Sequence, residues 1–519
     1  MKFNYLKAFL SLSLLSITLV QCKKDKSTDT TATREQLTMD SIFLYAKEIY
    51  LWNDALPSYA SFNPRSYTSY GMGLAPLEKE LFRLSQYKIN SSTGKPYEYS
   101  SSDPTSPKYS YIDDKEASGA TAFIKPSQSY VELDGAGTDF GIGIARFTAT
   151  DIRISYVNAS SPASAASLSR GDKIVSINGR TTKAETQTDV DYINNAFNAS
   201  GIKLVIQKLS GTTVTINLTQ ATYSTSPVIK KAVIEKDGKK IGYLVFARFS
   251  TLSNAQSDLD AAFADFATAG VTDLVIDLRY NGGGYVSTAE YLINLIAPPS
   301  LNGKTMYSAY YNDMMKNGNA KILQHQPFYD ENHNLTPYKS GINGKFVTYA
   351  DLDYSVSGNT YSFGKKGSLN GVKNVCFIVS GKTASASELT INALKPYLNV
   401  KLVGSTTYGK PVGFFGIDID KYTVYMSNFQ TKNANGEGGY FTGMTVDIPA
   451  TDDLTRDFGD QNEDCLAKAL KWIITGVTTT SNTVTLKNGT VISSTEVNPE
   501  VIPTQPTFTG MVENRYKLK

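Results

Sequence analysis

The sequence predicts an α/β protein whose core carries a mainly β domain and a small helical N-terminal region. Three patterns support this fold class. Apolar residues recur at helical spacing from Glu35 to about Leu84, short strands dominate 138–221, and strands alternate with helices from about Val228. At 519 residues the chain is too long for one compact core, so several domains are expected.

The composition limits the classes of function to consider. The formal charge is +3, and it falls by two without Lys2 and Lys7, which lie in a segment that we expect to be removed. A charge this close to neutral gives no electrostatic case for a nucleic-acid partner. Cys376 and Cys465 lie in apolar runs and are expected to be buried. No cysteine or histidine has the spacing of a metal site, so neither a metal nor another cofactor is predicted.

The N-terminus has the pattern of a secretory signal. A positively charged start precedes an apolar run over 8–20, which is too short to span a bilayer. We therefore predict a signal peptide over residues 1–21. The polar residues that follow predict a tether over 22–34.

The end of this signal resembles the lipobox of bacterial lipoproteins. In Leu19-Val20-Gln21-Cys22 the cysteine would become the lipidated first residue of the mature chain, although Gln21 stands where Gly, Ala or Ser is usual. The resemblance implies a lipoprotein of the bacterial cell envelope, anchored in a membrane through Cys22 and facing the periplasm or the cell surface. An ordinary cleaved signal peptide with an incidental cysteine is the alternative.

Residues 35–118 form the predicted helical N-terminal region. Asp40 and Ser41 are placed to cap a helix, and 91–118 is rich enough in Ser, Tyr, Pro and Lys to be a loop. One helical face would carry Ile42, Tyr45, Ala46, Ile49 and Tyr50.

Residues 138–221 contain three features in a characteristic order. The stretch Phe140-Gly141-Ile142-Gly143-Ile144 opens the segment, Ser161-Pro162-Ala163 starts a short helix, and Arg170-Gly171-Asp172 leads into a strand closed by an Asn-Gly turn. The features occur in the order found in PDZ domains, and we interpret 138–221 as a PDZ-like domain on this resemblance. It implies that the amides of Ile142, Gly143 and Ile144 bind the terminal carboxylate of a peptide that adds a strand to the sheet edge. Alone, the glycines would indicate only a tight turn.

Residues 222–475 alternate between strand and helix patterns, which predicts a partly parallel sheet. A segment rich in Tyr, Asn and Gly interrupts them at 298–371, and we expect it at the surface near a cleft. The final segment, 476–519, is predicted to be a tail with one hairpin at Lys487-Asn488-Gly489.

Residues 379–388, V-S-G-K-T-A-S-A-S-E, raise two interpretations. A phosphate-binding loop needs a glycine five residues before Gly381, but Cys376 stands there in a strand-like run, which argues against nucleotide binding. The other interpretation makes Ser385 a nucleophile at a strand-to-helix turn, where helix amides face developing negative charge. A tightly packed helix start explains the same residues equally well.

Two further motifs favour the nucleophile. Lys410 lies 25 residues after Ser385, between Gly409 and Pro411, where poor solvation would lower its pKa toward that of a general base. The run Asp277-Leu278-Arg279-Tyr280-Asn281-Gly282-Gly283-Gly284 ends a strand with glycines that can turn an amide toward an oxyanion. That run alone could also be an ordinary strand terminus.

Together these motifs resemble the C-terminal processing peptidases, tail-specific proteases with a Ser-Lys pair. The resemblance implies a ClpP/crotonase-like α/β protease core and a serine endopeptidase that works through an acyl-enzyme. Ser385 matches the nucleophile, Lys410 the base and Glu388 a supporting residue, while the oxyanion donors would be the amide of Ala386 and that of Gly283 or Gly284. The implied partners are protein or peptide substrates with accessible C-termini, recognised partly through their tails.

One departure leaves the third catalytic residue unassigned. Many family members carry a Gln four residues after the lysine, where it orients the amine, but this position is Phe414 here, and Pro411 follows the lysine. A backbone carbonyl or another side chain would have to orient Lys410.

A non-catalytic peptide-binding lipoprotein of the envelope is the alternative function. A carbohydrate-handling protein is suggested only by the tyrosines of 298–371.

Overall fold

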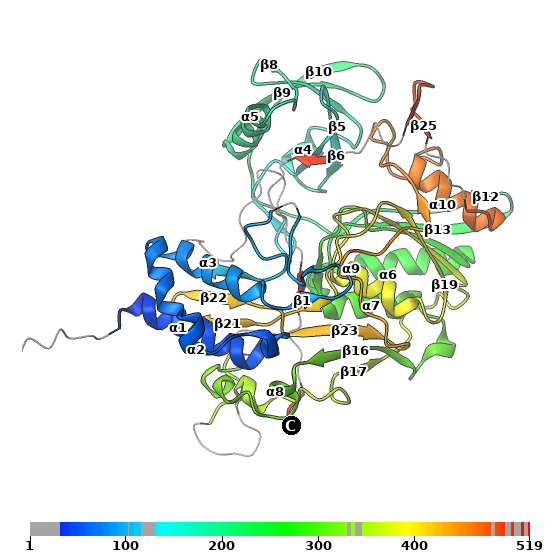
Figure 1. Ribbon diagram of the computed structural model, residues 1–519. Coiled ribbons are helices and arrows are strands. Elements are labelled where there is room, and N and C mark those ends of the chain that lie inside the picture. Colours follow the sequence, from blue (N-terminus) through cyan, green and yellow to red (C-terminus); the bar gives the residue numbers. More distant parts are fainter. Residues whose placement is uncertain are drawn as a thin grey trace, which may run out of the picture.

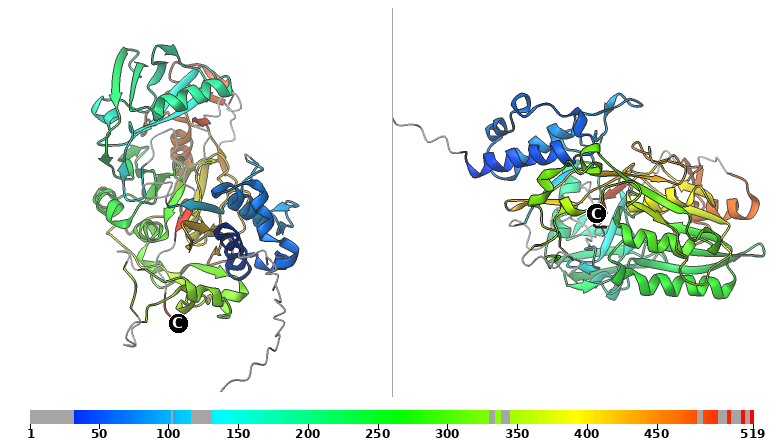
Figure 2. Two further views of the ribbon diagram at one scale, coloured as in Figure 1. Left: turned by 90° about the vertical axis from the view of Figure 1, so that its left-hand side faces the viewer. Right: turned by 90° about the horizontal axis from the view of Figure 1, so that it is seen from below.

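The computed structural model describes most of the chain and combines a central α/β core with a mainly β domain and N-terminal helices (Figures 1 and 2). It describes residues 32–101, 103–115, 131–329, 334–337, 345–478, 483–493, 500–502, 510–512 and 517–519. The predicted signal peptide and Cys22 lie outside these residues. Among the helices that are described, none is both long enough and apolar enough to cross a membrane.

The core is a six-stranded sheet that is parallel except at one edge, where β12 runs antiparallel to β13. In spatial order its strands are β12 (Val228–Lys236), β13 (Lys239–Phe246), β14 (Asp273–Asp277), β18 (Asn374–Val379), β19 (Asn399–Gly404) and β24 (Ile448–Pro449). Ile276 of β14 pairs with Leu244 on one side and with Phe377 on the other. The predicted alternation of strands and helices therefore produces a parallel sheet.

Helices cover both faces of this sheet (Figure 1). On one face lie α6 (Leu252–Ala269), α7 (Val286–Ile296) and α9 (Ala386–Leu394), and on the other lies α10 (Asp464–Thr475). Successive side chains of a strand point to opposite faces. Accordingly, Leu274 and Ile276 pack with the three helices, whereas Val275 packs with α10. This layered arrangement confirms the predicted α/β core.

The PDZ-like part has a sheet and an apolar core of its own, at the top of Figure 1. Its elements are β5 (Ile142–Thr148), β6 (Asp151–Val157), α4 (Pro162–Ala165), β7 (Lys173–Ile177), β8 (Arg180–Thr181), α5 (Gln187–Asn198), β9 (Gly201–Gln207) and β10 (Thr213–Thr219). Gly141 has φ +79°, and a Cβ there would lie 2.0 Å from the Cβ of Ser161, the N-cap of α4. Only glycine fits this approach.

The N-terminal helices lie to one side of the core in both views of Figure 2. They are α1 (Arg34–Ile49), η1 (Asn53–Ala55), α2 (Tyr59–Phe62), η2 (Pro64–Tyr70) and α3 (Leu74–Ser85). The predicted cap at Asp40 and Ser41 is wrong, because Thr33 already accepts from the amide of Gln36 and starts the helix. Asp40 instead accepts from Arg65, with a shortest N···O distance of 2.7 Å.

The predicted loop at 91–118 and the insertion at 298–371 are more regular than expected. Within the former are β2 (Lys95–Pro96), which pairs with β1 (Ile89–Asn90), and β3 (Tyr111–Asp114), which joins β22 (Tyr422–Tyr425) and β21 (Gly416–Ile419). The insertion contributes η3 (Pro299–Leu301), β16 (Thr305–Tyr311), α8 (Asp313–Lys316), η4 (Lys321–His325), η5 (Tyr349–Asp351) and β17 (Thr360–Ser362). Strand β16 pairs with β23 (Phe429–Asn433), and the tyrosines Tyr307 and Tyr311 are buried, so part of the insertion is core rather than surface.

The C-terminal residues contain the predicted hairpin, formed by β25 (Thr483–Thr485) and β26 (Val491–Ser493). The same segment also contributes β27 (Glu500–Ile502) to the sheet of the PDZ-like part, and β28 (Gly510–Val512) pairs with β15 (Gly283–Tyr285). A simple tail with one hairpin was therefore too limited a prediction for this segment.

A buried charge network joins the PDZ-like part to the core. Arg170 contributes to it by donating to Asp452 and to the hydroxyl of Tyr280, the latter at 2.7 Å. Arg279, also buried, donates to Asp452 at 2.6 Å and to Glu463 at 2.8 Å. Burial alone would raise the pKa of Asp452, but the two guanidinium groups lower it to about 2.

The substitution Asp452→Asn should therefore destabilise the chain by about 3–5 kcal/mol at neutral pH, because it leaves two buried guanidinium groups without their shared carboxylate. The lowered pKa means that this contribution is complete above the unfolded value of about 3.9 and is lost as the pH falls toward 2. Urea unfolding should show a gap between wild type and variant that narrows below about pH 4. Asp457→Asn, at an exposed ion pair with Lys230, is the control; a similar loss in both variants would contradict the prediction.

Candidate active site

Ser385 lies at the turn between β18 and α9, in a conformation that serine rarely adopts. Its φ is +58° and its ψ is −109°, which costs conformational energy in a residue other than glycine. The side chain is fully buried, and its Oγ makes no hydrogen bond with any residue that the structure describes. A buried hydroxyl without a partner is costly in a structural role, so the turn leaves this oxygen available for a ligand.

The glycine strand β15 (Gly283–Tyr285) runs directly beside this serine. A Cβ on Gly283 would lie 3.0 Å from the Cβ of Ser385 and 3.1 Å from the carbonyl oxygen of Ala384, and Gly283 has φ +110°. The predicted glycine run is therefore required by a close approach of two backbones as well as by its dihedral angles. The amide of Gly283 donates to the side chain of Asn281 at 2.9 Å, so it is already engaged.

Asn281 fastens the glycine strand to α9, a role that the sequence motif alone did not reveal. Its carbonyl oxygen accepts from the amide of Ala384 at 3.1 Å and from the hydroxyl of Ser387 at 3.0 Å. Its side-chain amide donates to the carbonyl of Phe246 at the end of β13. One asparagine therefore connects a core strand, the glycine strand and the start of α9. Ala386 is the first residue of that helix, where backbone amides have no acceptor within the helix.

Lys410 is fully buried at the turn that leads into β20 (Val412–Gly413). Its Nζ lies 4.4 Å from the ring centroid of Phe414 and donates to the carbonyl oxygen of Tyr109 at 3.5 Å. Burial lowers the pKa of Lys410 to about 7, and the negative charges of Glu98 and Glu388 oppose this shift in part. The amine therefore becomes neutral near physiological pH, as the sequence predicted from its unsolvated turn.

Glu388 joins the serine turn to the lysine turn. One carboxylate oxygen accepts from the amides of Ser385 and Lys410 at 2.9 and 2.8 Å, and the other accepts from the amide of Gly409 at 2.8 Å and the hydroxyl of Thr407 at 2.5 Å. Burial is the main cause of the raised pKa of Glu388, which these four hydrogen bonds oppose. The carboxylate thus holds the backbone of Ser385 and that of Lys410 on a single group.

A second buried carboxylate, Glu98, comes from the segment that was predicted as a loop. It accepts from the amides of Tyr109 and Ser110 and from the hydroxyls of Tyr50, Ser110 and Ser427, at distances between 2.8 and 3.3 Å. These bonds hold the Tyr109 carbonyl next to Lys410. Glu98 lies 312 positions before Lys410 in the sequence, and no local motif marks it.

The predicted peptide-binding residues of the PDZ-like part lie in strand β5 of its sheet. Ile142, Gly143 and Ile144 begin strand β5 and are buried, rather than forming a separate loop. A Cβ on Gly143 would lie 2.3 Å from the ring of Tyr156 on β6. The edge of β5 opposite β6 pairs with β27 of the C-terminal segment.

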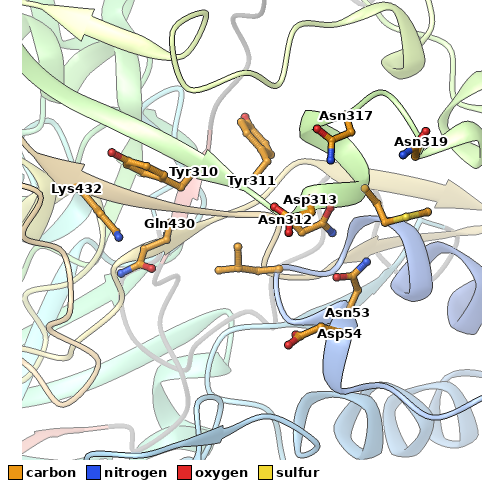
Figure 3. A pocket seen from close by; sticks show the side chains of 12 residues that line it. Asn53, Asp54, Tyr310, Tyr311, Asn312, Asp313, Asn317, Asn319, Gln430 and Lys432 are labelled. Atoms are coloured by element: carbon orange, nitrogen blue, oxygen red, sulfur yellow. The ribbon is translucent and has the colours of Figure 1, made fainter.

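A cavity of about 380 Å³ lies between η1, β16, α8 and β23, and neither Ser385 nor Lys410 lines it (Figure 3). Tyrosine and asparagine side chains line it, which fits the composition of the insertion. Asn312 uses its side chain to bind the carbonyls of Glu48 and Tyr50 and the amide of Met315, so it has a structural role. Among the described residues, no group of three or more His, Cys, Asp or Glu is arranged to hold a metal ion.

Known protein families match the α/β core and the PDZ-like part of the chain. The family model described as peptidase family S41 matches residues 240–450, and that of the PDZ domain matches 130–207. The chloroplastic C-terminal processing peptidase of Tetradesmus obliquus is 25% identical over 308 residues, which are 56% of this chain and 55% of that protein. The carboxy-terminal processing protease CtpA of Bacillus subtilis is 23% identical over 291 residues, which are 56% of this chain and 51% of that protein.

The chain thus spans about half the length of these curated relatives. A crystal structure from Bacteroides fragilis NCTC 9343, described as that of an S41 protease, superimposes with a TM-score of 0.54 at 23% identity. The superposition covers 85% of this chain and 97% of that one, which shows a shared fold. The two family models identify this chain as one that carries a peptidase family S41 domain together with a PDZ domain.

Proposed function

We propose that this chain is a serine endopeptidase that cleaves proteins recognised partly through their C-terminal tails, with Ser385 as nucleophile and Lys410 as general base. The observation that carries the proposal is that one carboxylate oxygen of Glu388 binds the backbone amides of both a buried lysine, whose pKa is about 7, and a buried serine whose hydroxyl has no hydrogen-bond partner among the described residues. The backbone amides of both residues donate hydrogen bonds to the carboxylate of Glu388. A serine hydroxyl needs such a base to become a nucleophile at neutral pH.

The reaction follows from these groups. Neutral Lys410 takes the proton of Ser385 as Oγ attacks the carbonyl carbon of the substrate, and the resulting ammonium group donates that proton to the leaving amine. Water then hydrolyses the acyl-enzyme. The amide of Ala386 at the start of α9 is one donor to the oxyanion. Gly284 is the better candidate for the second, because the amide of Gly283 already donates to Asn281.

Tyr109 and Phe414 take the place of the missing glutamine in this proposal. The carbonyl oxygen of Tyr109 accepts from Lys410 Nζ, and the face of the Phe414 ring lies 4.4 Å from the same atom. An aromatic ring attracts an ammonium group without accepting its proton, and a carbonyl oxygen orients the amine. Both are positioning residues that hold Lys410 Nζ in place while the amine gains and loses its proton.

Cleavage should depend on both catalytic residues. Ser385→Ala and Lys410→Ala should each lower the turnover of an unfolded protein with an apolar C-terminal tail by at least about a thousandfold. Lys382→Ala is the matched control, because this half-buried lysine lies three residues before Ser385 and has no role in the mechanism. Mass spectrometry of the products gives both the rate and the bonds cleaved. If Ser385→Ala and wild type gave the same products at the same rate, Ser385 would not be the nucleophile; if neither gave products, the chain would be a peptide-binding protein without this chemistry.

The pH dependence should report the charge of Lys410. Because the base must be neutral, kcat/KM should rise with pH through a midpoint near 7. Glu98→Gln removes a negative charge that raises the pKa of Lys410, so the midpoint should move to lower pH. Glu235→Gln, at an exposed side chain, should leave the midpoint where it is. A Glu98→Gln midpoint at or above that of wild type would argue against Lys410 as the base.

The lipid anchor also belongs to this proposal, since a lipidated Cys22 would hold the peptidase at a bacterial envelope membrane. Expressed in a bacterial host, wild type should incorporate labelled palmitate and sediment with membranes, whereas Cys22→Ser should do neither. Absence of palmitate from wild type would favour an ordinary signal peptide, and palmitate in the variant would show that the lipid is attached to a residue other than Cys22.

A further inference from the structure

The last residues of the chain contact three distant surfaces: the PDZ-like sheet, the groove beside Ser385 and the insertion. Strand β27 pairs antiparallel with β5, and the red arrow beside β6 in Figure 1 is this strand. Strand β28 pairs with β15, and residues 517–519 contact the segment around η5. Strand β27 is the edge strand of the PDZ-like sheet, and β28 pairs with β15 outside the six-stranded core sheet.

The first contact has the form in which an extended peptide adds to the edge of a sheet. Glu500 pairs with Arg146, Val501 with Ala145 and Ile502 with Ile144, so the segment runs toward Gly143 and Ile142. These are the residues for which the sequence predicted peptide binding. The edge is therefore occupied by an internal segment of the same chain.

The second contact lies at the candidate active site. The amide of Gly510 donates to the carbonyl of Gly282 at 3.2 Å, and on the other side the carbonyl of Met511 accepts from the amide of Phe414 at 3.4 Å. A Cβ on Gly283 would lie 2.4 Å from the carbonyl oxygen of Gly510 and 3.0 Å from the Cβ of Ser385, so both atoms lie close to one point. The peptide bond between Gly510 and Met511 is therefore beside the serine.

Side-chain burial fixes the segment in this groove. Met511 is fully buried and belongs to the main apolar core of the molecule. Backbone pairing on both sides and a buried anchor residue are what a groove provides for an extended polypeptide. Strand β28 therefore fills the place that a bound polypeptide would take beside Ser385.

The third contact secures the end of the chain on the insertion. Lys519 donates from its amide to the carbonyl of Asp351 at 3.0 Å and from Nζ to that of Ala350 at 2.6 Å. The carbonyl of Lys517 accepts from the amide of Asp353 at 2.8 Å. The chain is therefore bound on both sides of the bond next to Ser385, and the insertion supplies the far side.

We propose that β5, the groove between β15 and Phe414, and residues 349–353 form one path for an extended polypeptide, and that strands β27 and β28 together with residues 517–519 are its resident ligand. A protein substrate must displace this segment to reach Ser385. The ligand class is an unfolded polypeptide tail, and the residues of this chain that make the three contacts lie within the 20 positions from Glu500 to Lys519. This inference rests on the proposed function in one respect: the proposed function makes the groove beside Ser385 a site of cleavage.

Displacing the resident segment should open the path to a peptide of the same sequence. The probe is a fluorescein-labelled peptide of residues 498–519, and the chain carries Ser385→Ala so that no cleavage can remove either ligand. Met511→Asp places a charge in the apolar core and should release the segment. Fluorescence anisotropy should show the probe binding at least tenfold more tightly to Met511→Asp than to the chain with the native segment.

Val491→Asp is the matched control, since it also introduces an aspartate but at a position of the C-terminal hairpin that is 62% exposed. This control should bind the probe as weakly as the Ser385→Ala chain that carries the native segment. Gly510→Pro is the second variant, because it removes the amide that donates to Gly282 without adding a charge. Thermal melting shows which variants are folded, and equal probe binding by the folded opened variants and the control would overturn the inference.

The same variants with Ser385 intact separate this inference from the proposed function. Release of the segment should raise kcat/KM on an unrelated unfolded protein severalfold, through KM rather than kcat. If the opened variants bound the probe but no variant cleaved protein, the path would stand and the peptidase proposal would fail. If all cleaved equally and none bound the probe more tightly than the control, the resident ligand would be wrong and the peptidase proposal would stand.

Discussion

The carboxylate of Glu388 is the group on which the arrangement of the site depends. It is fully buried, and its two oxygens accept four hydrogen bonds from the serine turn and the lysine turn, which are separated along the chain. Hydrogen bonds to an ionised acceptor are stronger than neutral ones, and a buried carboxylate without them would be costly. This carboxylate compensates for the unfavourable φ of Ser385 and holds the backbone of Lys410 in register with it.

The proposed chemistry depends on a balance of interactions around the amine of Lys410. Burial favours the neutral form of Lys410, whereas Glu98, Glu388 and the ring of Phe414 favour the ammonium form. Burial alone would keep the amine neutral but would make it a poor proton acceptor. The nearby charges bring the pKa to about 7, where the lysine can both take a proton from a serine and return it to a leaving amine.

The parts of this arrangement that sequence alone predicts are those that neighbouring residues determine. The parallel core follows from alternating apolar patterns, and Ser385, Glu388, Lys410 and the glycine run stand in short motifs. Glu98 and Tyr109 could not be found in this way, because they reach Lys410 from a polar stretch about 300 residues away and contribute a carboxylate and a backbone carbonyl without a motif. The cap at Asp40 was wrong because Thr33 and Gln36 form an earlier start signal.

Strands β27 and β28 were not predicted from the sequence for a different reason. Each has three residues, too few for a pattern of alternation, and each is a strand only because an existing edge accepts it. The path that they follow joins the PDZ-like edge, the glycine strand and the insertion, which have no common sequence signal.

The central claim, that Lys410 is a base held near neutrality beside Ser385, can be measured directly. In a chain labelled with ¹³C at the ε-carbon of lysine, the Lys410 resonance can be assigned by its absence in Lys410→Arg and followed by NMR as the pH is varied. The account predicts that it titrates with a pKa of about 7. A midpoint near the ordinary lysine pKa of about 10.4 would contradict it.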